Sequence, residues 1–167
     1  MDENKKIEQL KFCISRYDKF YDNVNSKGNL YLPLNSFLLS GIIGGYFSLK
    51  EKLVFDSTTI FLLCITLLLN LLSIGFTIWA TMPFLKSTQK LTTSLLFFKD
   101  VAKNTWTEFD TKYNSLTEQD VYMDFKKQGY ILATGLEKKF SYLKAATIFL
   151  LLEFLGIIII GIIIFNK

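Results

Sequence analysis

The stretch that decides the fold is AATIFLLLEFLGIIIIGIIIFN, residues 145–166, which is long, apolar and interrupted by a single charge at Glu153. A bilayer core of about 30 Å is crossed by roughly 20 helical residues, so this stretch predicts a membrane-spanning helix. Hydrophobic residues make up 50% of the 167-residue chain, which exceeds what a soluble core of that size needs. The chain is therefore predicted to be one small membrane protein.

Two further stretches without charges precede it. Residues 57–85 are long enough to cross a bilayer, whereas residues 33–49 are a little short, and whether they cross fully stays open. The predicted fold is an all-α membrane protein with three transmembrane helices and additional cytoplasmic helices. Its expected parts are an N-terminal amphipathic helix at 1–32, a hairpin of two spans at 33–85, a cytoplasmic helical region at 86–144 and a third span at 145–167.

Basic residues predict the orientation of the spans. Six lysines and arginines precede Pro33, two lie in residues 50–56 and ten lie in residues 86–144. Because cytoplasmic loops carry the excess of such residues, the N-terminus and the long middle segment are predicted to be cytoplasmic. The first apolar run follows 32 residues of mixed charge, so no cleaved leader is expected. An aromatic belt at the cytoplasmic ends of the spans would consist of Tyr31, Trp79 and Tyr142.

The N-terminal segment has the spacing of an amphipathic helix. Its apolar seam, with steps of three and four residues, consists of Ile7, Leu10, Ile14, Tyr17, Tyr21 and Val24. This helix is predicted to end near Ser26 to Gly28, where a glycine can act as a stop. The seam packs either against its own chain or against another subunit, and the pattern alone leaves both interpretations open.

The middle segment also predicts helices. One helical face in residues 91–110 consists of Leu95, Phe98, Ala102, Trp106 and Phe109. Thr117 and Asp120 then form a loose capping box before a helix that is predicted to run from about Glu118 to Ile164. No proline follows Pro83, and such a helix would be about 70 Å long.

The chain lacks the residue patterns of conventional catalysis. Histidine is absent, and Cys13 and Cys64 lie too far apart for a zinc or nucleophile motif. No nucleophile elbow, phosphate-binding glycine loop or cluster of metal-binding carboxylates is present in the sequence. We therefore expect no enzyme activity and no cofactor, and a membrane enzyme acting on lipid lacks an acid, a base or a metal group.

Glu153 lies near the middle of its span, where a charge costs roughly 3 kcal/mol by insertion scales. It can face a water-filled pore, pair with a polar residue such as Asn70, sit protonated in a packed interface, or mark a misplaced span boundary. In a symmetric oligomer, a pore-facing glutamate becomes a ring of carboxylates that favours cations. One face of the first span carries the small residues Ser36, Ser40 and Gly44. Such residues suit close helix contacts, within one chain or between chains, and they can also line a pore.

Several segments resemble a known family in the expected order. SLLFFKDVA at 94–102 and DFKKQGYILATGLEKKFSYLKAA at 124–146 are similar to the Pycsar effector domain of bacterial anti-phage nucleotide-signalling systems. NSKGNLYLPLNSFLL at 25–39 resembles the turn before that family's first span, and Met82 with Pro83 matches the proline after its second span. The family usually has an aspartate where this chain has Asn25.

The resemblance implies a membrane effector in the bacterial inner membrane. Its signal would be a cyclic or linear nucleotide from a partner nucleotidyltransferase or cyclase. Effectors of Hailong-type systems are similar in role, and there the nucleotide is thought to restrain the effector. The expected protein is a homo-oligomeric pore or channel, tetrameric by analogy, that disrupts the membrane. The alternative is a non-conducting adaptor that recruits a cytoplasmic partner.

A nucleotide site needs cations for phosphate and an aromatic surface for the base. The candidates are lysines in or beside the segments that carry the resemblance, together with aromatic residues near them. They are Lys99, Lys103, Lys126, Lys127, Trp106 and Tyr130. The middle segment holds ten lysines against seven acidic residues, so its net charge is small. Double-stranded nucleic acid is therefore not expected as a ligand.

Overall fold

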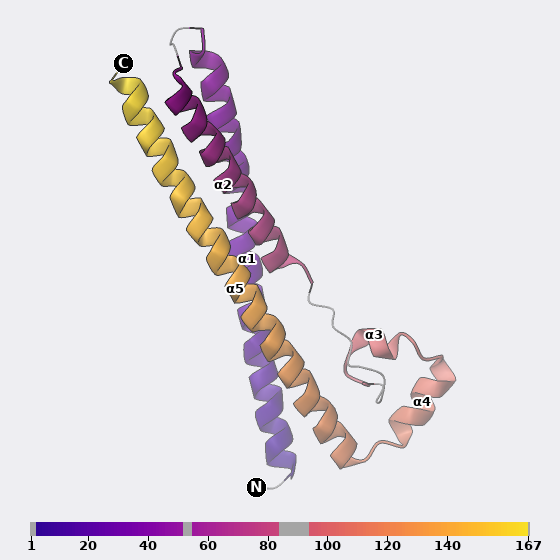
Figure 1. Ribbon diagram of the computed structural model, residues 1–167. Coiled ribbons are helices and arrows are strands. Elements are labelled where there is room, and N and C mark those ends of the chain that lie inside the picture. Colours follow the sequence, from indigo (N-terminus) through magenta and orange to yellow (C-terminus); the bar gives the residue numbers. More distant parts are fainter. Residues whose placement is uncertain (1–2, 52–54, 84–93, 167) are drawn as a thin grey trace. The chain divides into compact units, whose positions relative to one another are not determined.

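Helices make up most of the described part of the chain. The computed structural model describes residues 3–51, 55–83 and 94–166. Its helices are α1 (Glu3–Leu49), α2 (Ser57–Thr81), α3 (Phe98–Val101), α4 (Trp106–Asn114) and α5 (Glu118–Phe165) (Figure 1). Within these ranges there is no strand, and three helices are long and apolar enough to cross a membrane. The predicted all-α fold with three spans is confirmed.

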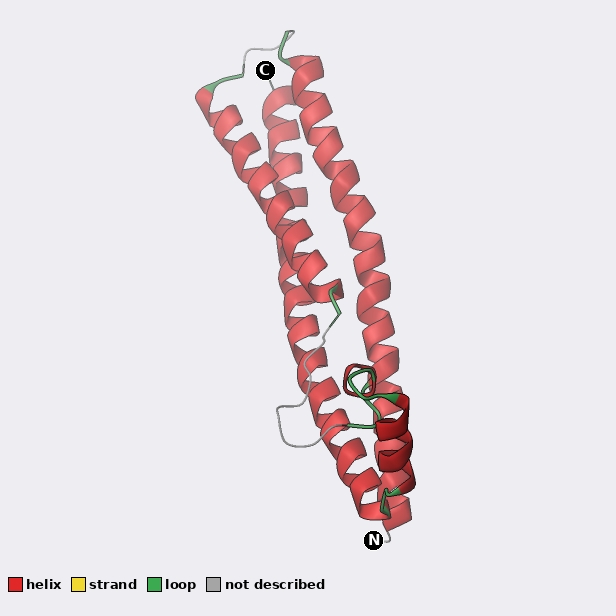
Figure 2. Ribbon diagram, turned by 90° about the vertical axis from the view of Figure 1, so that its right-hand side faces the viewer, coloured by secondary structure: helices red, strands yellow, loops and turns green. Residues whose placement is uncertain are grey.

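The contacts divide the chain into two compact units, and α1 and α5 each contribute to both. The spanning unit consists of Asn23–Met82 and Lys138–Lys167, and the head unit consists of Met1–Asp22 and Pro83–Glu137. In the spanning unit, α2 lies beside the second halves of α1 and α5 (Figures 1 and 2). The predicted span boundary at 85/86 and residues 91–93 of the predicted middle helix lie outside the described residues.

α1 shows that the predicted helix end near Ser26 to Gly28 is wrong. The helix continues through Gly28 and Pro33 as far as Leu49. Gly28 is buried, and a Cβ atom at this position would collide with the side chain of Thr81 in α2. This glycine therefore permits close packing between two helices instead of stopping one, and Pro33 removes only one main-chain hydrogen bond from the ladder.

The single helical face predicted for residues 91–110 is also wrong, because the chain breaks between α3 and α4. Thr105 caps α4 through a reciprocal capping box in which its hydroxyl accepts from the Glu108 amide and the Glu108 carboxylate accepts from the Thr105 amide. Such a cap satisfies amide groups that an uninterrupted helix would otherwise bond. The TWTE sequence at 105–108 therefore starts a new helix.

α5 confirms the long helix that was predicted from the cap at Thr117. The Asp120 carboxylate accepts hydrogen bonds from the Thr117 amide at 3.1 Å and from its hydroxyl at 2.5 Å, and the Thr117 hydroxyl accepts from the Asp120 amide at 3.2 Å. These bonds lower the pKa of Asp120. The helix then continues for 48 residues, or about 72 Å at 1.5 Å per residue.

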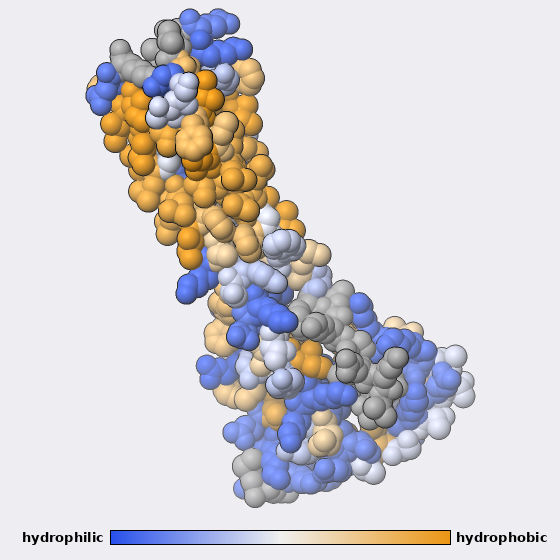
Figure 3. All heavy atoms as spheres, viewed as in Figure 1, coloured by the Kyte–Doolittle hydropathy of each residue, from blue (hydrophilic) through white to orange (hydrophobic). Residues whose placement is uncertain are grey.

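The spanning unit is apolar outside, and its interior contains both apolar and polar side chains. Apolar residues gather over its surface (Figure 3), and Phe37, Phe61 and Leu151 are 73%, 64% and 58% exposed. The described residues buried in α2, in contrast, are Thr59, Thr66, Asn70, Ser73, Thr77 and Ala80. Lipid tails compete for apolar side chains but offer no hydrogen bonds, so hydrogen bonds between helices add to close packing in holding this bundle together.

Candidate functional site

The buried residues of α2 form a polar seam along one side of the helix. Steps of seven, four, three, four and three residues separate Thr59, Thr66, Asn70, Ser73, Thr77 and Ala80, which is the spacing of a single helical face. The hydroxyls of Thr66 and Thr77 donate to main-chain carbonyls of their own helix at 2.8 Å. Asn70 and Ser73 instead bond to other helices.

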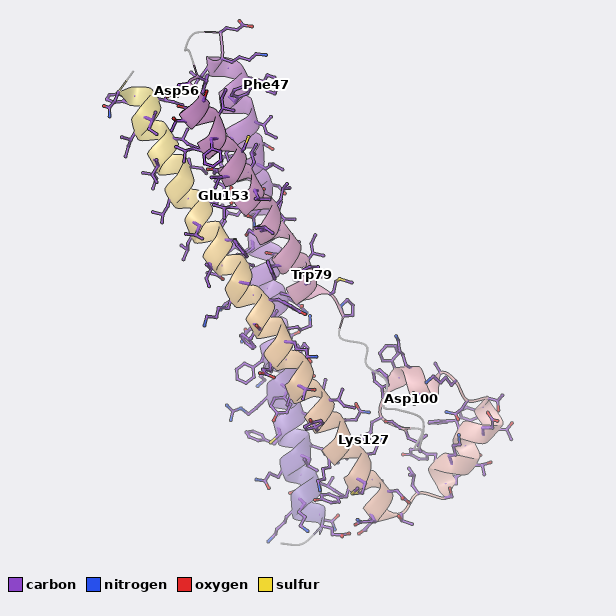
Figure 4. The ribbon with its side chains drawn as sticks, viewed as in Figure 1. Phe47, Asp56, Trp79, Asp100, Lys127 and Glu153 are labelled. Atoms are coloured by element: carbon purple, nitrogen blue, oxygen red, sulfur yellow. The ribbon has the colours of Figure 1, made fainter. Side chains whose placement is uncertain are left out.

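Glu153, Asn70 and Asn35 meet in the middle of this unit, one from each long helix. Asn70 Nδ2 donates to Glu153 Oε1 at 2.8 Å and to the main-chain oxygen of Asn35 at 3.0 Å. Asn35 Nδ2 donates to the main-chain oxygen of Tyr31 at 2.8 Å. All three side chains have 0% exposure, and Glu153 lies within the spanning part of α5 (Figure 4). We call these three residues the buried polar cluster.

The cluster answers part of what the sequence left open about Glu153. The carboxylate and Asn70 lie inside the bundle of one chain and are bonded to each other. Several copies of the chain are therefore not needed to shelter this acid from lipid. The other three residues predicted for a pore or bundle interior, Ser36, Ser40 and Gly44, are exposed on α1. They are outside the bundle of a single chain, and their lining of a pore between chains stays a prediction.

Close contacts between α2 and α5 fix the register of the cluster. A Cβ atom on Gly156, one turn beyond Glu153, would lie 2.6 Å from Thr66 Oγ1. Ser73 Oγ donates to the main-chain oxygen of Ala146 at 3.2 Å. Small and hydroxylated residues thus let the two backbones approach each other and bond directly.

In the head unit, Ser94, Asp124 and Gln128 join the two segments that carry the family resemblance. Asp124 Oδ2 accepts from the Ser94 hydroxyl and from the amides of Leu95 and Leu96, at 3.0, 3.0 and 3.2 Å. Gln128 Nε2 donates to Ser94 Oγ at 3.0 Å. These bonds hold the chain that leads into α3 against the start of α5.

A cavity of about 950 Å³ lies in the head unit, between this attachment, α4 and α5. Ligand pockets have volumes of roughly 300–1,000 Å³. Its cationic and aromatic lining residues are Lys112, Lys126, Lys127, Tyr113, Phe125 and Tyr130. Two carboxylates also line it, and both accept hydrogen bonds from the chain itself, Asp120 from Thr117 and Asp124 from Ser94.

The structure brings together three of the six predicted nucleotide-binding residues. Lys126, Lys127 and Tyr130 line the cavity, and Lys127 lies on the first part of α5 (Figure 4). Lys99, Lys103 and Trp106 are not among its lining residues. Lys103 forms an ion pair with the buried Asp100 at 2.8 Å, and Trp106 is 77% exposed.

Several residues of these sites were missed in the sequence. Lys112 and Tyr113 line the cavity from α4, but no local pattern places α4 opposite α5. Asn35 was missed because a lone asparagine in a short span has no partner that the sequence identifies. The polar seam of α2 could have been found, because its threonines, serine and asparagine recur at helical spacing in an otherwise apolar span.

The structure defines a class of protein, a three-span helical membrane protein with a buried polar cluster in its bundle and a lysine-lined cavity in its head unit. The family model of the Pycsar effector protein domain matches residues 9–166. The chain belongs to this family, which makes it a membrane effector of bacterial anti-phage defence. No curated protein and no solved structure matches the chain.

Proposed function

We propose that the chain forms a homo-oligomeric pore or channel that disrupts the bacterial inner membrane under the control of a nucleotide. The nucleotide would be cyclic or linear and would come from a partner nucleotidyltransferase or cyclase. The observation that carries the proposal is the head cavity, in which three lysines and two tyrosines surround about 950 Å³.

The cavity has the chemistry of an anion site with an aromatic surface. Lysine ammonium groups bind phosphate as charge-assisted donors, and tyrosine rings offer a face on which a base can stack. The acidic residues of the lining oppose phosphate less than free carboxylates would, because Asp124 already accepts three hydrogen bonds from residues 94–96. Lys126 Nζ also lies 5.9 Å from the ring centroid of Tyr122, within the range of a cation–π contact.

The exposed small-residue face of α1 supports contacts between copies. Ser36, Ser40 and Gly44 are exposed, and a Cβ atom at Gly41, Gly44 or Gly45 would meet nothing within 4 Å. Faces of this kind let helices approach closely in lipid. A tetramer is proposed by analogy with the family.

The orientation is proposed with the N-terminus in the cytoplasm. Six basic residues precede Pro33 and ten lie in residues 86–144, which is the bias of cytoplasmic segments. The rings of Trp79 and Tyr142 lie 6.0 Å apart and are 56% and 38% exposed. Such aromatic residues anchor spans at the membrane interface.

Calorimetry with the full chain in detergent tests the nucleotide site. Candidate cyclic and linear nucleotides would be titrated into wild type, Lys126→Ala/Lys127→Ala and Lys138→Ala, an exposed lysine on the same helix outside the cavity. We expect the double variant to lose at least tenfold in affinity, about 1.4 kcal/mol, while Lys138→Ala binds as wild type does. Equal affinity for all three proteins would remove the cavity from the proposal.

Ion leak from liposomes separates the pore from the adaptor. The enclosure of Glu153 within one chain favours the adaptor, because the acid then needs no pore to shelter it. Gly44→Leu should block close contact on the α1 face and abolish leak, whereas Gly161→Leu, an exposed glycine of α5, should not. Bilayers that stay tight with the wild type at every nucleotide concentration would favour the adaptor.

A further inference from the structure

The buried polar cluster contains three oxygen atoms that lack partners. Asn35 Oδ1, Asn70 Oδ1 and Glu153 Oε2 are buried and have no hydrogen-bond partner among the described residues. Each belongs to a side chain with 0% exposure, and the three come from α1, α2 and α5. Leaving one buried acceptor unsatisfied costs about 1–3 kcal/mol, so these three oxygens point to a partner outside the described side chains.

The existing hydrogen bonds link these residues to one another. Asn70 Nδ2 contacts both Glu153 Oε1 and the main-chain oxygen of Asn35. In a planar amide or carboxylate the second terminal atom is bound to the same carbon as the first, so Asn70 Oδ1 and Glu153 Oε2 lie next to this contact. Asn35 Nδ2 is directed to Tyr31, which leaves its Oδ1 as the atom still to be paired.

The chemistry of the three oxygens selects the partner. All are acceptors, and one belongs to a carboxylate, so the partner must donate or carry positive charge. Calcium prefers six to eight oxygen ligands with several carboxylates, magnesium needs a near-octahedral shell, and transition metals favour nitrogen or sulfur. One carboxylate and two amide oxygens therefore match a small monovalent cation.

The surroundings supply no competing charge. Residues 32–49 of α1 and all of α2 contain no Asp, Glu, Lys or Arg. The titratable groups on the helices that face Glu153 are Tyr31, whose hydroxyl pairs with Thr147 at 3.0 Å, Tyr46, which packs on Phe55, and Cys64, which is exposed. On α5 itself the nearest charge is Lys144, which is exposed and nine residues away.

We propose that Glu153, Asn70 and Asn35 form a binding site for a small monovalent cation, Na⁺, inside the spanning unit of each chain. The cation bridges the three long helices and neutralises the carboxylate. Ion sites in membrane proteins are built in this way near the middle of the bilayer, from a few oxygens on separate helices. The site requires neither the nucleotide nor a pore between chains.

Thermal unfolding of the full chain in detergent tests the site. In the first arm, NaCl replaces N-methyl-D-glucamine chloride at constant ionic strength and pH 8. In the second arm, the pH is lowered from 8 to 5 without Na⁺. A Na⁺ site predicts a saturable rise in Tm of about 5–10 °C at a concentration 100-fold above the dissociation constant. A rise with falling pH that is independent of the salt is what protonation of the Glu153 carboxylate alone would give, and it would not support a bound cation.

Variants assign the response to the cluster. Glu153→Gln keeps the shape and an acceptor for Asn70 but removes the charge, and Asn35→Leu removes one oxygen, so both should flatten the response. Ser73→Ala, a buried position on the same face of α2, should retain it. For any variant that does not fold, binding of ²²Na⁺ to the wild type, with competition by protons, provides a second measurement.

Three outcomes overturn the proposal. The first is a wild-type Tm that does not rise with Na⁺, whether or not it rises as the pH falls. The second is an equal rise with N-methyl-D-glucamine chloride, which would be a general salt effect. The third is a response of Glu153→Gln equal to that of wild type, which would place the site elsewhere.

Discussion

Gly156 is a position where one added methyl group should disturb the contact between α2 and α5 directly. An added Cβ would lie 2.6 Å from Thr66 Oγ1 and 3.3 Å from Thr66 Cγ2. Because both branches of the threonine face this atom, rotation about χ1 exchanges one crowded contact for another. Rotation also breaks the 2.8 Å hydrogen bond from Thr66 Oγ1 to the Leu62 carbonyl. Gly156→Ala should therefore push α5 away from α2, one turn from the Asn70 contact of Glu153.

Gly161 provides the reference for the size of this effect. It lies on the same helix, and a Cβ atom there would meet nothing within 4 Å. Replacing glycine by alanine in a helix gains about 0.8–1 kcal/mol at either position. Crowding a packed interior costs typically about 1–3 kcal/mol. Gly156→Ala should consequently be about 1–3 kcal/mol less stable than Gly161→Ala.

Reversible unfolding in mixed micelles, followed by tryptophan fluorescence, measures the difference. Thr66→Ala removes both crowding atoms, so the double variant Gly156→Ala/Thr66→Ala should recover most of the loss, and the double-mutant cycle isolates the contact. The reasoning is refuted if Gly156→Ala is as stable as Gly161→Ala, or if Thr66→Ala gives no recovery.

Three further predictions concern the head unit and the orientation. Asp124→Asn removes the charge that accepts three hydrogen bonds and should lower the free energy of unfolding of the head by about 1.5–3 kcal/mol, measured by urea unfolding, whereas the exposed Asp110→Asn should change little. The amide of Thr105, and then its hydroxyl, lower the pKa of Glu108 below its ordinary 4.5. Amide protection of α4 in hydrogen exchange should thus be full above pH 4.5 and fall as the pH drops through the lowered pKa, and Glu108→Gln should flatten that profile. Ser15→Cys, in a variant whose Cys13 and Cys64 are both replaced by serine, should react with a membrane-impermeant maleimide in inverted vesicles. It should stay unlabelled in right-side-out vesicles if the N-terminus is cytoplasmic.

Local chemistry made much of the helical fold predictable. The start of α5 follows from the reciprocal bonds of Thr117 and Asp120, and its length follows from the absence of proline. The errors arose where one residue type has two uses. Gly28 was interpreted as a helix stop, although its small size serves contact with Thr81. The break before α4 was visible as a capping box at Thr105, but the apolar spacing across it obscured that signal.

The sites depend more on tertiary structure. Lys126, Lys127 and Tyr130 were predictable because they share one helix, whereas Lys112 reaches the same cavity from α4. The pairing of Asn70 with Glu153 was one of several open interpretations, since a span's hydropathy does not reveal which face points inward. Asn35 entered the cluster only through the packing of three helices.

The polar seam of α2 has a consequence for how the protein is made. Each span is hydrophobic enough to pass from the translocon into the bilayer individually. The bundle forms afterwards, as hydroxyls, amides and carbonyls of different helices pair with each other. A substitution such as Thr66→Leu or Ser73→Leu would favour insertion of the span into lipid, but it would remove a polar side chain at the contact between the helices. Biogenesis of this chain can therefore fail after insertion has succeeded, and leave correctly inserted helices that never associate.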